Sequence, residues 1–66
     1  MKWKVIIDKL NKSNCVRIVP EQEKLSRQHT MEASANRFAT IDEAVEYARV
    51  LTQVSGIRHI RINHNA

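Results

Sequence analysis

Residues 38–62 read FATIDEAVEYARVLTQVSGIRHIRI, and this stretch decides the fold. Thr40 precedes Glu43 by three positions, which is the spacing of a capping box that satisfies free N–H groups at the start of a helix. Apolar residues then recur at the spacing of one helix face, and the single glycine of the chain follows them as a stop signal. The stretch therefore predicts a helix over residues 41–55 and a strand over residues 57–62.

Two apolar segments ahead of this stretch are typical of strands. Residues 2–8 and residues 15–19 each alternate so that one face is apolar. The polar residues between them suit a hairpin loop, and Pro20 ends the second strand because it cannot donate to a central ladder. Residues 21–37 begin with a polar run, which leaves two alternatives: a mobile loop, or a short third strand near residues 30–35.

These elements predict a single α+β domain over residues 1–66, with the element order β-β-(β)-α-β. We expect a small three- to four-stranded antiparallel or mixed sheet with one helix packed on one face. The predicted core consists of apolar side chains on the shared face of the strands and the inner side of the helix: Trp3, Val5, Ile7, Val16, Ile18, Phe38, Ile41, Ala44, Val45, Ala48, Leu51, Val54, Ile60 and Ile62.

The chain is short and basic. Its 66 residues would bury only about 60% of the surface that the unfolded chain exposes, so we expect a thin core and no catalytic cleft between two lobes. The net charge of +4 and the sequence pI of about 9.7 favour anionic partners, either nucleic acid or an acidic protein surface.

Several other chemistries are not expected. Cys15 is the only cysteine, so no internal disulfide forms and a reducing compartment, the cytoplasm, is favoured. No window approaches the ~20 apolar residues that cross a bilayer, so no membrane partner is predicted. The sequence has neither metal-ligand spacing nor a glycine-rich phosphate loop, so no metal and no cofactor are predicted. A thiol enzyme would require Cys15 to contact His59 across neighbouring strands; we favour a small polarisable filler beside a surface histidine.

The sheet face away from the helix is the first candidate binding surface. Such a face can lie against a phosphate backbone or enter a major groove, although no aromatic residue lies among the basic ones to stack on single-stranded bases. The alternative is an ordinary solvated sheet face, on which Lys and Arg are common. The basic residues that would share this face are Lys2, Lys4, Arg17, His59 and Arg61.

The polar segment 21–37 is the second candidate surface. It carries Lys24, Arg27, His29 and Arg37, and a polar loop of this kind can become ordered on a protein partner. The alternative is a solvated linker.

A homodimer is a further alternative for the same region of the molecule. Ile6, Val19 and Ile57 would lie on the sheet face away from the helix and could form an apolar seam between two copies. A small sheet also leaves an edge strand that can pair with another copy.

The start of the helix resembles a pattern found in several small families. Residues 38–48, FATIDEAVEYA, are similar to short bacterial and phage domains of unknown function, in which a hairpin precedes this helix start and a final strand follows it. They also resemble the arm-site DNA-binding domains of tyrosine recombinases, in which a three-stranded sheet reads DNA and a helix with this kind of start backs it. The resemblance implies a bacterial or phage origin and a sheet that contacts the partner.

The sequence therefore predicts a small binding module that is not an enzyme. The first hypothesis is a protein-binding accessory or inhibitor that docks through the sheet edge, the face away from the helix and residues 21–37. The second is nucleic-acid binding through the basic sheet face.

Overall fold

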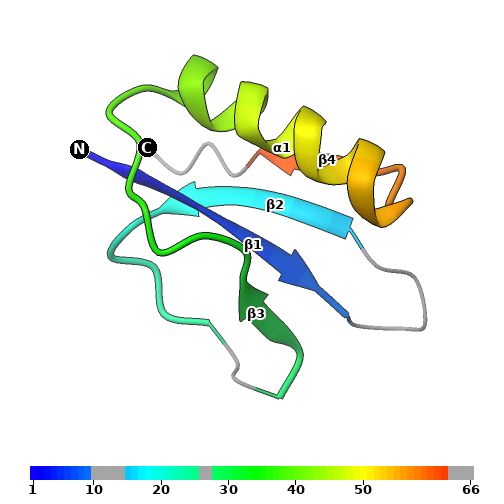
Figure 1. Ribbon diagram of the computed structural model, residues 1–66. Coiled ribbons are helices and arrows are strands. Elements are labelled where there is room, and N and C mark those ends of the chain that lie inside the picture. The colour runs from blue at the N-terminus through cyan, green and yellow to red at the C-terminus, as the bar shows by residue number, and fades with distance from the viewer. Residues whose placement is uncertain (10–14, 26–27, 63–66) are drawn as a thin grey trace.

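A mixed four-stranded sheet with one helix packed on it forms the protein, which confirms the predicted α+β class (Figure 1). The computed structural model describes residues 1–9, 15–25 and 28–62. The segment after the hairpin contains the short third strand rather than only a loop. The elements in chain order are β1 (Trp3–Asp8), β2 (Cys15–Pro20), β3 (Thr30–Glu32), α1 (Ile41–Ser55) and β4 (Ile60–Ile62).

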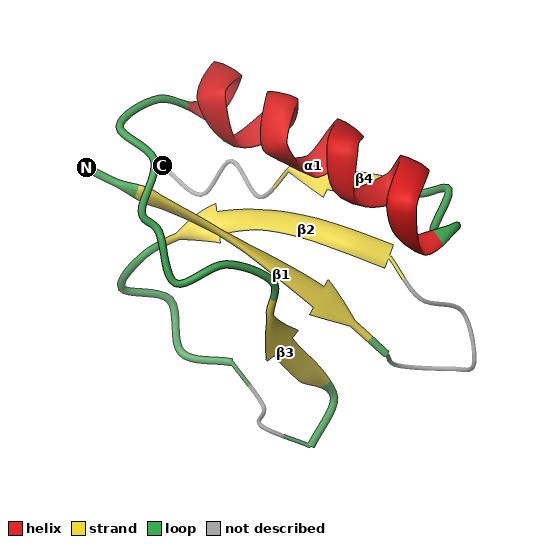
Figure 2. Ribbon diagram, in the orientation of Figure 1, coloured by secondary structure: helices red, strands yellow, loops and turns green. Residues whose placement is uncertain are grey.

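The strands lie in the order β3-β1-β2-β4. β1 is antiparallel to both β2 and β3, whereas β4 runs parallel to β2. A strand that runs parallel to its neighbour needs a crossover connection. Here α1 is part of the connection that leads to β4. Figure 2 shows the helix lying along one side of the sheet, over the central strands.

The register of the hairpin places the apolar residues of both strands on the face that α1 covers. Val5 pairs with Ile18 and Ile7 pairs with Val16, so these side chains project to the same side. The intervening pair of Ile6 and Arg17 projects to the opposite side. The predicted alternation of β1 and β2 is therefore present.

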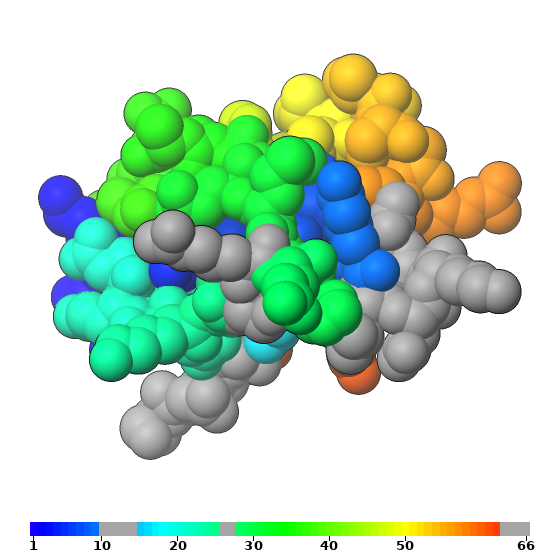
Figure 3. Space-filling view, turned by 90° about the horizontal axis from the view of Figure 1, so that it is seen from below, coloured from blue at the N-terminus to red at the C-terminus, as the bar shows by residue number. Residues whose placement is uncertain are grey.

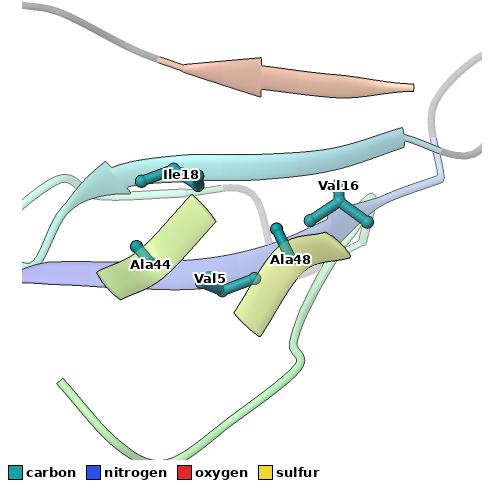
Figure 4. Close-up of a cluster of buried hydrophobic side chains, with 5 residues drawn as sticks. All are labelled: Val5, Val16, Ile18, Ala44 and Ala48. Atoms are coloured by element: carbon teal, nitrogen blue, oxygen red, sulfur yellow. The ribbon is translucent and has the colours of Figure 1, made fainter. Parts of the chain in front are cut away.

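Two alanines allow the helix to approach the sheet closely. Ala44 and Ala48 are fully buried against Val5, Val16 and Ile18, which are fully buried as well (Figure 4). A face of small side chains on the helix leaves room for the branched side chains of the strands, as close packing requires. Larger apolar side chains surround this cluster and are partly buried: Trp3, Phe38, Val45, Tyr47, Leu51, Ile57 and Ile60.

The ends of α1 follow the predicted caps. The hydroxyl of Thr40 accepts a hydrogen bond of 3.2 Å from the backbone N–H of Glu43. At the other end Gly56 has φ of 78°, in the left-handed region, and its N–H donates to the carbonyl of Thr52 at 2.9 Å. Both contacts satisfy backbone groups that a helix terminus otherwise leaves without partners.

Replacing Gly56 by Ala should lower the free energy of unfolding by about 1 kcal/mol, because a Cβ disfavours the left-handed conformation. No heavy atom lies within 4 Å of the position that the Cβ would take, so the cost is conformational and not steric. Gly56→Asn should lose less, since Asn tolerates this region better. Chemical denaturation measures both variants, and equal losses for Ala and Asn would contradict the explanation.

Three parts of the sequence prediction are wrong in detail. Val54 is 81% exposed and does not belong to the core, because it lies roughly a quarter of a turn from the buried face of α1. Ile62 is 38% exposed, because its strand lies at the edge of the sheet. The last strand spans three residues and not the predicted 57–62, since Ile57 instead packs against the core beneath the helix.

The sheet face away from α1 is also partly covered, which the sequence did not predict. Ile6 and Val19 project to this face and are both 0% exposed. Residues 21–25, here called the strap, lie over it: the amine of Lys4 donates to the carbonyl of Glu23 at 2.9 Å, and Leu25 lines a hollow together with Lys4 and Ile6. Figure 3 shows the surface that the chain forms after β2, in cyan to green.

Candidate partner-binding surface

Strand β4 closes one edge of the sheet. Its residues Ile60, Arg61 and Ile62 pair with Val16, Arg17 and Ile18 of β2, and just before the strand the N–H of Val16 donates to the carbonyl of His59 at 2.8 Å. In the described ranges no strand lies beyond β4. The backbone groups on its outer side therefore face away from the sheet.

The two faces of β4 differ in chemistry. Ile60 and Ile62 lie on the side that α1 covers, as do their pairing partners in β2, while Arg61 lies on the opposite side. Ile60 is half-buried, and both Arg61 and Ile62 are exposed. The edge is therefore apolar on one face and cationic on the other.

A shallow hollow of about 400 Å³ adjoins the cationic face of this edge. The described residues that line it are Cys15, His59, Ile60 and Arg61. His59 directly precedes β4, which neighbours the strand that carries Cys15, and both residues line this hollow. The hollow also brings together His59 and Arg61, two of the predicted binding residues.

Two other predicted binding residues are already engaged within the molecule. Arg17 forms ion pairs with Asp8 at 3.2 Å and with Glu23 at 3.6 Å, and all three side chains are at most 22% exposed. The amine of Lys4 is bound to the strap through the Glu23 carbonyl. An anionic ligand on this face would compete with these contacts.

The cations of the predicted basic face thus separate into two groups. Lys4, Arg17 and Arg61 do share the face away from α1. Arg17 pairs with Arg61 of β4 and with Ile6 of β1, and Lys4 lies two residues from Ile6 on the same face. Lys2 and His59 are exposed at its margins. The centre of the face is neutralised by Asp8 and Glu23 together with the strap, and the cations that stay exposed lie toward the periphery.

The basic residues of segment 21–37 also differ from one another. Arg37 binds Glu32 at 2.7 Å and lies 3.8 Å from Glu21, so its charge is paired. Lys24 and His29 are exposed. The predicted binding residue Arg27 lies outside the described residues.

The apolar dimer seam predicted for the face away from the helix is wrong. Ile6 and Val19 lie on that face, but neither is exposed, and Ile57 packs against the core under α1. The exposed large apolar residues lie elsewhere. In the described part of the chain they are Met1, Met31, Val50, Val54 and Ile62.

Sequence reasoning missed the acidic partners of Arg17. Asp8 pairs with Cys15 across the hairpin, two positions from the pair of Ile6 and Arg17, so the two charges are diagonal neighbours on one face. A hairpin register written out from the two strand predictions would have revealed Asp8. No pattern in the sequence indicates that Glu23 folds back from the strap.

Comparisons with protein-family models, with curated proteins and with solved structures found no match. The described residues form no helix with the length and apolar character needed to cross a lipid bilayer. Among these same residues, no three His, Cys, Asp or Glu side chains come together as a potential metal site. The site must therefore be interpreted from its own geometry, as an edge strand of a small α+β domain.

Proposed function

We propose that this protein is a non-enzymatic protein-binding module, an accessory or inhibitor that docks through the β4 edge. The observation that carries the proposal is the outer side of β4, a three-residue edge strand with exposed Arg61 and with Ile62 38% exposed. An edge strand presents unpaired backbone donors and acceptors to which another chain can add a strand.

The opposite edge of the sheet is less suited to this role. At β3 the side chain of Arg37 binds Glu32, and it also reaches the carbonyls of Ala35 and Asn36 at 3.4 and 3.5 Å. The chain continues along β1 beyond β3, where Phe38 and Trp3 exchange two hydrogen bonds of 2.8 Å. Local contacts of this kind protect an edge from pairing.

Nucleic-acid binding by the basic sheet face is the alternative. It has less support, because a phosphate would have to displace Asp8 and Glu23 from Arg17 and the strap from Lys4. A cytoplasmic location is part of the main proposal, since the lone Cys15 suits a reducing compartment.

Site-specific photo-crosslinking in the cells that express the chain tests the proposal. A photoreactive residue at Ile62 should form adducts with a protein, whereas the same residue at Gln53, which is exposed on α1, should not. Adducts that nuclease removes, or equal protein adducts from both positions, would contradict docking at this edge.

A gel shift with duplex DNA separates the two functions. We expect no shift at about 50 mM or about 200 mM salt, whereas binding to phosphates would be strong at the lower concentration and would weaken steeply at the higher. If a shift appears, Arg61→Glu is the variant to examine. Charge reversal at Arg17 is less informative, because it would also disrupt the ion pairs of Arg17 with Asp8 and Glu23.

A further inference from the structure

We infer that the β4 edge binds an extended acidic segment whose side chains alternate between carboxylates and aliphatic groups. This inference rests on the proposed function and adds the chemistry of the partner. It follows from which side chains flank the outer side of β4 on each face of the sheet, and from the charge that surrounds them.

The alternation follows from the pleat. A strand added to β4 places successive side chains on opposite faces, so every second one meets the face of Ile60 and Ile62 and the others meet the face of Arg61. Aliphatic side chains would extend the apolar surface that Ile62 leaves exposed. Carboxylates would lie beside Arg61 and His59, at the mouth of the hollow that these two residues line with Cys15.

The acidic character follows from the charges near the edge. Residues 56–62 contain Arg58, His59 and Arg61 and no acidic residue, and all three basic side chains are exposed. Opposite charges on paired strands stabilise the pairing, and like charges directly opposite one another destabilise it. An added strand that carries carboxylates is therefore favoured over a neutral or basic one.

The same charges disfavour a second copy as the occupant. Two β4 strands paired antiparallel about a two-fold axis must place residues of the same face opposite each other. If the axis passes through Arg61, two arginines meet. If it passes through Ile60, Arg61 meets His59 of the other copy. Both of these arrangements oppose basic side chains, whereas an axis through Ile62 would place Arg61 opposite residue 63, which lies outside the described residues.

Nucleic acid is disfavoured by the number and position of the exposed cations. Two paired arginines, Arg17 of β2 and Arg61 of the edge strand β4, lie on this sheet face, and Arg17 is held by Asp8 and Glu23. Arg61 is left as the exposed arginine of that pair. An extended peptide can form backbone hydrogen bonds with β4 in addition to this charge contact. A phosphate backbone has no N–H groups and cannot extend the sheet in this way.

Binding of synthetic peptides to the isotope-labelled chain, followed by NMR and fluorescence anisotropy, tests the inference. The probe is a capped peptide of about six residues that alternates Glu and Val. The comparison peptides are the Lys and Val alternation, a peptide of the same composition with its Glu residues in one block, and the probe with N-methyl groups on alternate amides. Only the probe should bind well, with signal changes at Ile60, Arg61 and Ile62.

Charge variants supply the matched controls. Arg61→Glu should weaken binding of the probe about tenfold, since it replaces an attraction with a repulsion across the strands. It should also strengthen binding of the Lys and Val peptide. Arg49→Glu makes the same charge change at an exposed position on α1 and should alter neither affinity. Loss of probe binding without gain of the basic peptide would contradict a direct charge contact.

The outcomes distinguish this inference from the function on which it rests. If peptides bind only with signal changes at Val50 and Val54 on α1, the inference is overturned and protein binding stands. If the chain associates through β4 and ignores every peptide, the occupant is a second copy and the inference is overturned. If duplex DNA binds and no peptide does, both proposals are overturned. If nothing binds, the inference is overturned and the crosslinks from Ile62 decide the function.

Discussion

Replacing Ile6 by Ala should lower the free energy of unfolding by about 3 kcal/mol, the middle of the range for removing a fully buried aliphatic side chain. Ile6 is 0% exposed although it projects away from α1, on the sheet face where the strap is bound to Lys4 and Arg17. A domain of 66 residues has a total stability of about 3–10 kcal/mol, so this loss is a large share of the total. Urea denaturation followed by circular dichroism measures it.

Val54→Ala is the matched control, because the sequence pattern places Val54 in the core and Ile6 on the sheet face away from the helix. The helical spacing places Val54 in the core, yet it is 81% exposed. Its truncation should change the free energy of unfolding by no more than about 0.5 kcal/mol, since Ala has the better helix propensity and little apolar contact is lost. If Val54→Ala were the costlier variant, the strap would not cover the sheet as described.

The main elements were predictable because each carries its own local signal. Thr40 and Gly56 bound the helix through backbone chemistry that does not depend on the rest of the fold. The alternation in β1 and β2 likewise identifies which side chains face α1, since the pleat has a period of two residues. The sequence left the sheet antiparallel or mixed, and the parallel pairing of β4 with β2 makes it mixed.

The strap over the sheet face away from α1 was not predictable, because it carries no local signal of this kind. Glu23 lies in a polar run with no periodicity, and its position depends on contacts with Lys4 of β1 and Arg17 of β2. Such tertiary contacts leave no local pattern. The same holds for the candidate binding surface: the sequence predicted its basic residues but not Asp8 and Glu23, which pair with Arg17.

Ala48→Asp should leave the chain unfolded at room temperature. Ala48 is 0% exposed and packs with Val5 and Val16 in the buried cluster between the helix and the sheet (Figure 4). A carboxylate there has no hydrogen-bond donor in this apolar cluster, and burying an unpaired charge costs several kcal/mol, which is comparable to the whole stability of the domain. Displacing the helix to hydrate the carboxylate would expose the same cluster. Circular dichroism should show loss of the cooperative thermal transition.

Val50→Asp tests the same chemical change two residues further along α1. Val50 is 58% exposed, and Val and Asp have similar helix propensities, so the loss should stay below about 1 kcal/mol. A folded Ala48→Asp variant with a loss no larger than that of Val50→Asp would mean that the alanine face of α1 is not the contact that holds the helix on the sheet. The placement of β4 would then be in question as well. The chain reaches the β4 position through α1, which packs on β1 and β2.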